Sequence, residues 1–160
     1  MVVDQTTIDM LRDRPVTLAD LSPGDACPVT TKSSTPSADL GPMLGDGPAR
    51  PVIGPTALIG IAPPENFGSE VWGGNKLLWA LSESSGVALL RGRQLDGSVE
   101  ARFGEGATPA AEKILDPTGR TPLNGGWFDF PGSVRLRQPG CYGFQIDVAS
   151  GSSVVVISAT

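Results

Sequence analysis

CYGFQIDVA at residues 141–149 and SSVVVISA at residues 152–159 are the two stretches that decide the fold. The second contains a continuous β-branched run from Val154 to Ile157, which suits a strand covered on both faces. In the first, apolar and small or polar residues alternate, so an extended chain places one apolar set on one side. That set is Tyr142, Phe144, Ile146 and Val148. We therefore expect two adjacent strands here, with a core beneath the aromatic face.

Shorter segments of the same kind precede this pair, separated by turn residues. Asp96-Gly97 is the strongest hairpin signal among the turns. The expected strands cover residues 56–62, 77–82, 87–95, 99–103, 113–115, 127–130 and 133–137. Eight or nine short strands with frequent turns predict an all-β, immunoglobulin-like, two-sheet antiparallel sandwich.

The first part of the chain has a different character. Residues 1–26 are predicted to form an extended arm with one helical turn over residues 6–12, capped by Thr6 or Thr7. Residues 28–55 are rich in proline and glycine, so a central strand is not expected there. The domain organisation predicted is an arm over 1–26 and a β-sandwich over 27–160.

Composition excludes several functional classes. The chain has 160 residues, enough for one domain, and carries a net charge of −5 without a basic cluster, so we expect no nucleic-acid partner. No apolar run approaches the ~20 residues of a membrane span. Histidine is absent, which removes the usual general base and the commonest metal ligand. Nucleotide and nucleophile-elbow motifs are also missing, so no cofactor and no metal are expected.

Cys27 and Cys141 are the two cysteines of the chain. A catalytic thiol needs a histidine partner, and two cysteines without histidine make a poor zinc site. The remaining interpretations are a structural disulfide and a pair of buried free thiols, and we favour the disulfide. Residues 1–4 show no signal peptide, so either the protein stays inside the cell or its signal or lipid anchor has been removed, and the cysteines favour removal.

PGCYGF at residues 139–144 adds a further architectural clue, because a turn feeding a strand with an early tyrosine is common in immunoglobulin-like domains. Other motifs occur in order along the chain: CPVT at 27–30, WGGNKLLW at 72–79 and RGRQLDG at 91–97. Together they resemble a family of uncharacterised exported or lipid-anchored bacterial proteins. The resemblance implies an extracytoplasmic location and supports pairing of the two cysteines. It implies no activity.

The candidate binding residues are one tryptophan and four arginines. Trp72 lies in a glycine-flanked loop, where it could stack on a sugar or anchor a protein, or fold back over the end of the domain. Arg91 and Arg93 share one strand face, as do Arg135 and Arg137. If those strands are neighbours, the four guanidinium groups form an anion site. The alternative is a solvated ladder with Glu83, Glu100 or Asp129.

These observations favour a non-catalytic exported or cell-surface module, binding or structural, that contacts a protein or a glycan. A structural domain with no ligand of its own is another hypothesis. The alternative is a small glycosidase-like hydrolase that uses two carboxylates. Its candidate acids are Glu65, Glu70, Asp96, Glu100, Asp116 and Asp129. Trp79 and Trp127 lie in expected strands and are assigned to the core.

Overall fold

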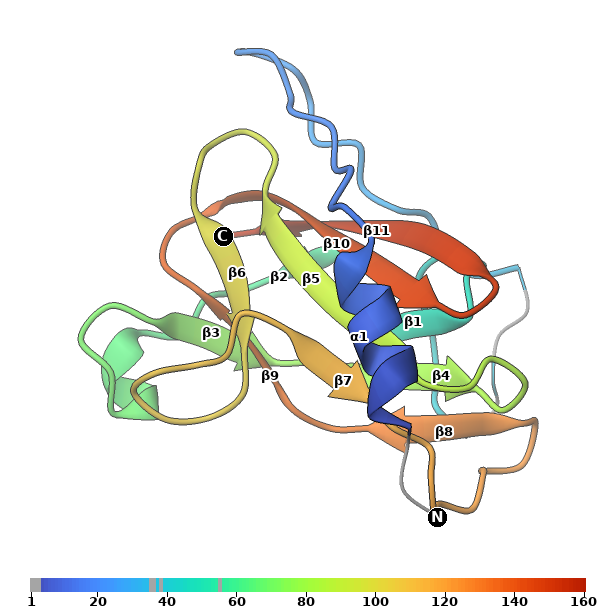
Figure 1. Cartoon of the computed structure of the whole chain (residues 1–160). Coiled ribbons are helices and arrows are strands. Elements are labelled where there is room, and N and C mark those ends of the chain that lie inside the picture. Colours follow the sequence, from blue (N-terminus) through green and yellow to red (C-terminus); the bar gives the residue numbers. More distant parts are fainter. Residues whose placement is uncertain (1–3, 35–36, 38, 55) are drawn as a thin grey trace.

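The computed structural model describes residues 4–34, 37, 39–54 and 56–160, and these residues form a mainly β structure (Figure 1). The helical segments are α1 (Gln5–Asp13) and the 3-10 turn η1 (Pro64–Phe67). The strands are β1 (Ala49–Val52), β2 (Leu58–Ile59), β3 (Gly73–Lys76), β4 (Leu78–Ser82), β5 (Ala88–Gln94), β6 (Glu100–Phe103), β7 (Lys113–Leu115), β8 (Trp127–Phe130), β9 (Ser133–Leu136), β10 (Gly140–Val148) and β11 (Gly151–Ala159). The all-β prediction is confirmed.

The larger sheet is built around the two deciding strands. β10 and β11 form an antiparallel pair that runs from Gly140 opposite Ala159 to Val148 opposite Gly151. The strand order is β2-β11-β10-β5-β6-β9-β3, and β7 pairs with one end of β5. The aromatic and aliphatic side chains of the alternating set on β10 all face the main core, as the pattern predicts.

This sheet curls until its two ends almost meet. β2 and β3 stand at opposite ends of the strand order, yet Ala62 and Gly74 exchange backbone hydrogen bonds of 2.8 and 3.1 Å. A Cβ on Gly74 would lie 2.1 Å from the Val134 carbonyl oxygen, and one on Gly73 would lie 2.4 Å from that of Ala62. The Gly-Gly pair therefore lets β3 lie close enough to both neighbours to draw the sheet toward a barrel.

The smaller sheet, in the order β1-β4-β8, packs against the concave side of the larger one. Trp79 on β4 meets Phe144 on β10 edge-to-face, with ring centroids 5.9 Å apart, and Phe103 on β6 meets the same ring at 6.1 Å. Trp79 is buried as predicted. Trp127 is only partly buried and carries the guanidinium of Arg50 4.7 Å from its ring centroid.

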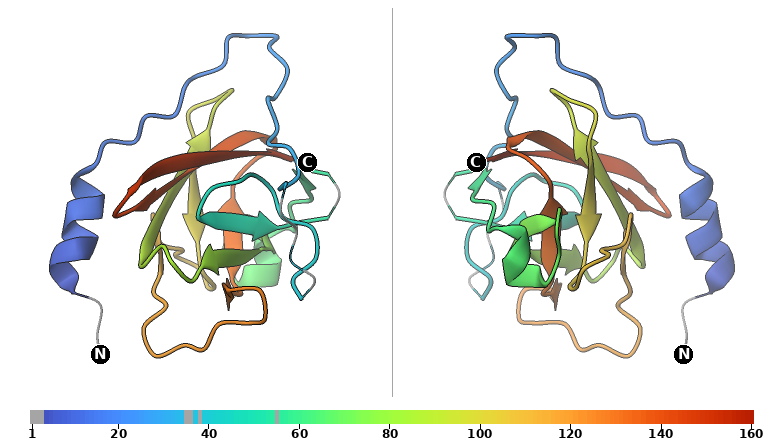
Figure 2. Two further views of the ribbon diagram at one scale, coloured as in Figure 1. Left: turned by 90° about the vertical axis from the view of Figure 1, so that its right-hand side faces the viewer. Right: turned by 90° about the vertical axis from the view of Figure 1, so that its left-hand side faces the viewer.

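The outer side of the larger sheet is covered by the N-terminal segment. Figure 2 shows α1 on this side, opposite β1. Ile8 and Leu11 of the helix pack on Val87 and Leu89. The helix is capped two or three residues earlier than predicted, because the side chain of Asp4, rather than that of Thr6 or Thr7, accepts a hydrogen bond from the Thr6 amide.

A disulfide joins Cys27 to Cys141, whose Cα atoms lie 5.5 Å apart, and this confirms the predicted pairing. The bridge spans 114 residues, and a loop of that length corresponds to about 4–5 kcal/mol in the chain-entropy model. Beside it, the Tyr142 hydroxyl donates to the Gln138 carbonyl oxygen at 2.7 Å, the contact expected for a tyrosine at this position. Burial raises the pKa of Tyr142 to about 12.

Two strands were not expected from the sequence. β1 lies in the proline-rich segment, but at the edge of the smaller sheet, where a proline is tolerated. β3 lies in the glycine-flanked loop after Trp72 and pairs with β9. The segment over 28–55 includes positions 35, 36, 38 and 55, which lie outside the described residues.

Candidate functional site

The predicted arginine strands are not neighbours, because β6 lies between β5 and β9. Arg93 on β5 stands opposite Glu100 on β6, and Arg102 on β6 stands opposite Arg135 on β9. The side chains therefore share one sheet face but form a charged ladder that includes Glu100. The Glu100 carboxylate is held by Arg102, its neighbour but one on β6. This arrangement matches the ladder alternative better than a cluster of four free guanidinium groups.

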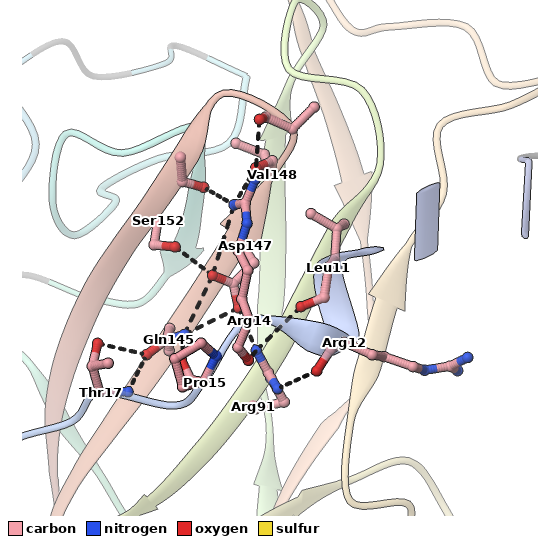
Figure 3. Close-up of polar contacts among 12 residues, drawn as sticks. Leu11, Arg12, Arg14, Pro15, Thr17, Arg91, Gln145, Asp147, Val148 and Ser152 are labelled. Carbon is pink, nitrogen blue, oxygen red and sulfur yellow. Dashed lines mark hydrogen bonds and ion pairs between the residues drawn. The ribbon is translucent and has the colours of Figure 1, made fainter. Parts of the chain in front are cut away.

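The Arg91 guanidinium binds the N-terminal segment (Figure 3). It donates to an Asp147 carboxylate oxygen at 2.7 Å and to the Arg14 carbonyl oxygen at 2.9 Å. Longer bonds of 3.3 and 3.4 Å reach the carbonyl oxygens of Arg12 and Leu11, where α1 ends. A charged donor thus satisfies carbonyl groups that the last helical turn leaves without partners.

Asp147 is the buried centre of this network, with 0% of its side chain exposed. Burial alone would raise the pKa of Asp147, but hydrogen bonds from Ser152, Arg91 and Gln145 outweigh it and lower that pKa. Arg14 lies 4.0 Å away and donates to the carbonyl oxygens of Val148 and Gly151 in the β10–β11 turn. The carboxylate therefore remains charged between two guanidinium groups.

Two further side chains fasten the extended segment after α1. Gln145 donates to the Pro15 carbonyl oxygen at 3.0 Å and accepts from the Thr17 amide at 2.8 Å. Arg93 forms an ion pair of 2.7 Å with Asp20 and also donates to the Leu18 carbonyl oxygen. Arg91 and Arg93, both predicted as ligand-binding residues, instead bind the chain's own N-terminal segment.

Arg135 is also a structural residue. It is fully buried, and its guanidinium donates to the carbonyl oxygens of Trp72 at 2.5 Å, Gly106 at 2.6 Å, and Gly73 and Gly104 at 3.1 Å. The Phe67 ring of η1 covers it, with 4.0 Å between the guanidinium carbon and the ring centroid. Burial lowers the pKa of Arg135, and Glu105 partly opposes that change. The residue joins the segment at Trp72 and Gly73 and the loop after β6 to β9, and its complete burial leaves it no surface for a ligand.

Trp72 folds back over the sheet, as the structural alternative predicts. It is 8% exposed, and its ring lies 4.9 Å from the Arg102 guanidinium carbon and 5.5 Å from that of Arg137. These stacking contacts fix the ring and the two arginines against one another. Little of the ring remains for a sugar to stack on.

Arg137 differs from the other predicted arginines, because it is exposed and, among the described residues, makes no hydrogen bond or ion pair. It lines a cleft of about 250 Å³. The other walls are Ile61, Pro63, Pro64, Leu136, Gln138 and Pro139, with contributions from Ala62, Gly73 and Thr160. The structure thus places one available guanidinium in a cleft whose lining residues are mostly aliphatic side chains and prolines.

A second hollow, of about 310 Å³, lies between Val16, Arg91, Arg93, Glu100 and Ala111. Its charged groups already have partners: both arginines hold the N-terminal segment, and Glu100 binds Arg102. Charge complementarity therefore favours the Arg137 cleft as the candidate site.

Sequence reasoning identified Arg137 but not the residues that shape its cleft. Those residues come from the segment between β2 and η1, the start of η1 and the turn between β9 and β10, which meet only when the sheet curls. Of the proposed acids, Asp96 accepts a hydrogen bond from the Cys141 amide and Asp116 from the Thr118 amide. Both are contacts that an acidic side chain commonly makes in a turn.

Two further observations concern metal ligands and membrane-spanning helices. Over the part of the chain that the structure covers, no three His, Cys, Asp or Glu side chains gather to hold a metal. In the same residues, no helix combines the length and the apolar character needed to cross a bilayer.

Comparisons with known proteins identify the fold but not a family. No family model matches the chain, and no curated protein matches it. A solved structure of a putative lipoprotein from Bacillus anthracis is similar, with a TM-score of 0.51 and 13% sequence identity. The similarity covers 86% of this chain and 88% of that one. At this identity the comparison establishes a shared fold across most of both chains.

Proposed function

We propose that the chain is a non-catalytic, extracytoplasmic binding module that contacts a protein or a glycan through the Arg137 cleft. The observation that carries this proposal is the position of the Arg137 guanidinium and its lack of hydrogen-bond partners among the described residues. Stacking on Trp72 holds it in place, no described residue satisfies its donors, and it lines a cleft with apolar walls. A prearranged charged donor beside apolar surface is typical of a recognition site.

The extracytoplasmic location draws support from the chemistry of the cysteines. Structural disulfides persist in oxidising compartments and are rare in the cytosol of most organisms. The fold shared with a putative lipoprotein and the motif resemblance to exported or lipid-anchored bacterial proteins agree with this location. The finer interpretation of the β fold as an immunoglobulin-like sandwich stays a prediction, since the larger sheet curls toward a barrel.

The non-catalytic character is proposed from the residue inventory. The chain has no histidine, and the cleft is lined by one charged side chain, which is an arginine. General acid–base catalysis requires a group that exchanges protons near neutral pH, and a guanidinium does not.

In-cell photo-crosslinking tests the proposed site. A photoreactive amino acid replaces the exposed Glu65, next to the cleft residue Pro64, and a control replaces the exposed Ser84 in the turn between β4 and β5. We expect a discrete adduct from position 65 that position 84 does not give. The same adducts from both positions, or none from position 65, would contradict binding at the cleft. A panel of chromogenic glycosides and esters tests for hydrolysis, and turnover of any of them would support the hydrolase alternative.

A further inference from the structure

Building on the proposed function, we propose that the Arg137 cleft binds an acidic peptide segment of a protein partner. In this arrangement a glutamate or aspartate carboxylate of the peptide accepts hydrogen bonds from the Arg137 guanidinium. A neighbouring apolar side chain of the peptide rests on the walls formed by Pro63, Pro64 and Pro139.

The guanidinium is suited to a carboxylate because of its geometry and its freedom. Its planar fork of N–H groups matches the two oxygens of a carboxylate. Arg91, Arg93 and Arg135 donate hydrogen bonds to carbonyl groups and carboxylates of the chain itself. Arg137 instead stacks on Trp72 at 5.5 Å, which limits its rotation without using its hydrogen bonds. Part of the conformational entropy of this side chain is therefore already lost in the free protein, so binding a ligand costs less.

The charge of the cleft is complementary to an acidic ligand. Among the side chains that line it, Arg137 is the one that carries a charge, and no Asp or Glu side chain is present; a main-chain oxygen of Thr160, which also belongs to the lining, accepts a hydrogen bond from the Ile61 amide at 2.8 Å. A bound carboxylate therefore meets a cation that no lining side chain neutralises. The net charge of the whole chain is −5, which attracts cations rather than acidic ligands. Selectivity for acidic segments must therefore come from this local site.

The walls favour a peptide over a glycan. Three prolines together with Ile61 give an apolar surface above the buried Leu136, while Gln138 adds a polar side chain at the rim. Glycan recognition commonly uses an accessible aromatic face and several hydrogen-bonding groups, and the nearby Trp72 ring is 8% exposed. Peptide segments supply alternating apolar and carboxylate side chains, which fit one apolar wall and one guanidinium.

A displayed peptide library, selected on the disulfide-bonded full chain, tests the inference. We expect enriched peptides to carry Asp or Glu beside an apolar residue. Synthetic copies of the enriched peptides, labelled with a fluorophore, are then titrated by anisotropy against the chain and its variants. Arg137→Gln should weaken binding about ten- to hundredfold, because a charge-assisted hydrogen-bond pair is lost. Arg137→Lys should recover part of the affinity, since it restores the charge without the fork.

Arg120→Gln is the matched control. Arg120 is also an exposed arginine over an aromatic ring, 4.1 Å from the Phe130 centroid, but it does not line the cleft. Its replacement should leave the affinity unchanged. The inference is overturned if selection enriches no peptide, enriches peptides without acidic residues, or yields peptides whose affinity is insensitive to Arg137→Gln. A position-65 crosslink to a glycan or a non-acidic protein would leave the cleft as a binding site while removing the acidic-peptide ligand.

Discussion

Replacing Asp147 with asparagine should destabilise the fold by removing one charge from the buried network under the N-terminal segment. The side chain is 0% exposed and pairs with Arg91 at 2.7 Å. Removing one partner of a buried ion pair costs about 3–5 kcal/mol. Arg91 and Arg14 keep their bonds to backbone carbonyls, so we expect a loss of about 3 kcal/mol in the free energy of unfolding.

The magnitude corresponds to a fall of about 6–12 °C in Tm for a domain of this size. Guanidinium unfolding of the disulfide-bonded protein, followed by tryptophan fluorescence, measures the free energy directly. Asp13→Asn is the control, because Asp13 is exposed and no ion pair within the described residues involves it. It should change the stability by about 0.5 kcal/mol or less.

The pH dependence gives a second, independent check. The pKa of Asp147 is lowered in the folded protein, so its stabilisation is fully present above the unfolded pKa of about 3.9 and disappears as pH falls through the folded pKa. The stability gap between wild type and Asp147→Asn should therefore be constant at neutral pH and narrow below about pH 4. A gap under about 0.5 kcal/mol at pH 7, or one that fails to narrow in acid, would refute the assigned role.

Three further predictions concern groups in or next to the packed interior. Arg135→Lys should lower the free energy of unfolding by about 2–4 kcal/mol, because one ammonium group does not replace the guanidinium bonds to four carbonyls; a loss below 1 kcal/mol in guanidinium unfolding would contradict this. Gly92→Ala should cost about 1–3 kcal/mol in Tm-derived stability, since its Cβ would lie 2.6 Å from the Phe144 ring; an unchanged Tm would show that the ring moves freely. Tyr142, the one tyrosine of the chain, should ionise near pH 12 by ultraviolet absorbance rather than near 10, so that folding stability declines as pH rises through that interval; a midpoint of 10 in folded protein would rule out its burial and bond.

The sequence predicts most of the strands because their side chains alternate. The short strands β7 and β8 match their expected ranges, and β10 and β11 begin one residue early. Burial on one face of a sheet imposes a period of two, and this period is visible without any knowledge of the partner strand.

β3 could not be predicted in this way. Its sequence, Gly73-Gly74-Asn75-Lys76, has no apolar alternation, and it becomes a strand because β9 and Ala62 approach it closely on both sides. This strand forms because its two glycines have no side chains and because partners distant in the sequence approach it, and a local pattern reveals neither.

The roles of the arginines depend on which strands become neighbours. The alternation of charged and apolar residues correctly placed Arg135 and Arg137 on one face, but it does not tell which of them η1 covers. Phe67 closes over Arg135 and leaves Arg137 exposed. Likewise, the buried polar pair Gln145 and Asp147 breaks the apolar character of a central strand, and that departure was the available signal for a docked N-terminal segment.

The most direct test of the account follows the Arg137 side chain itself by nuclear magnetic resonance. In ¹⁵N-labelled protein, a selected acidic peptide should shift the Arg137 Nε–Hε signal and the amide signals of Ile61 and Gln138, which line the same cleft. The amide signal of Thr17, which donates a hydrogen bond to Gln145 in the N-terminal segment's attachment, should stay in place. Peptide-induced shifts that avoid the cleft and gather on the N-terminal segment would contradict the account.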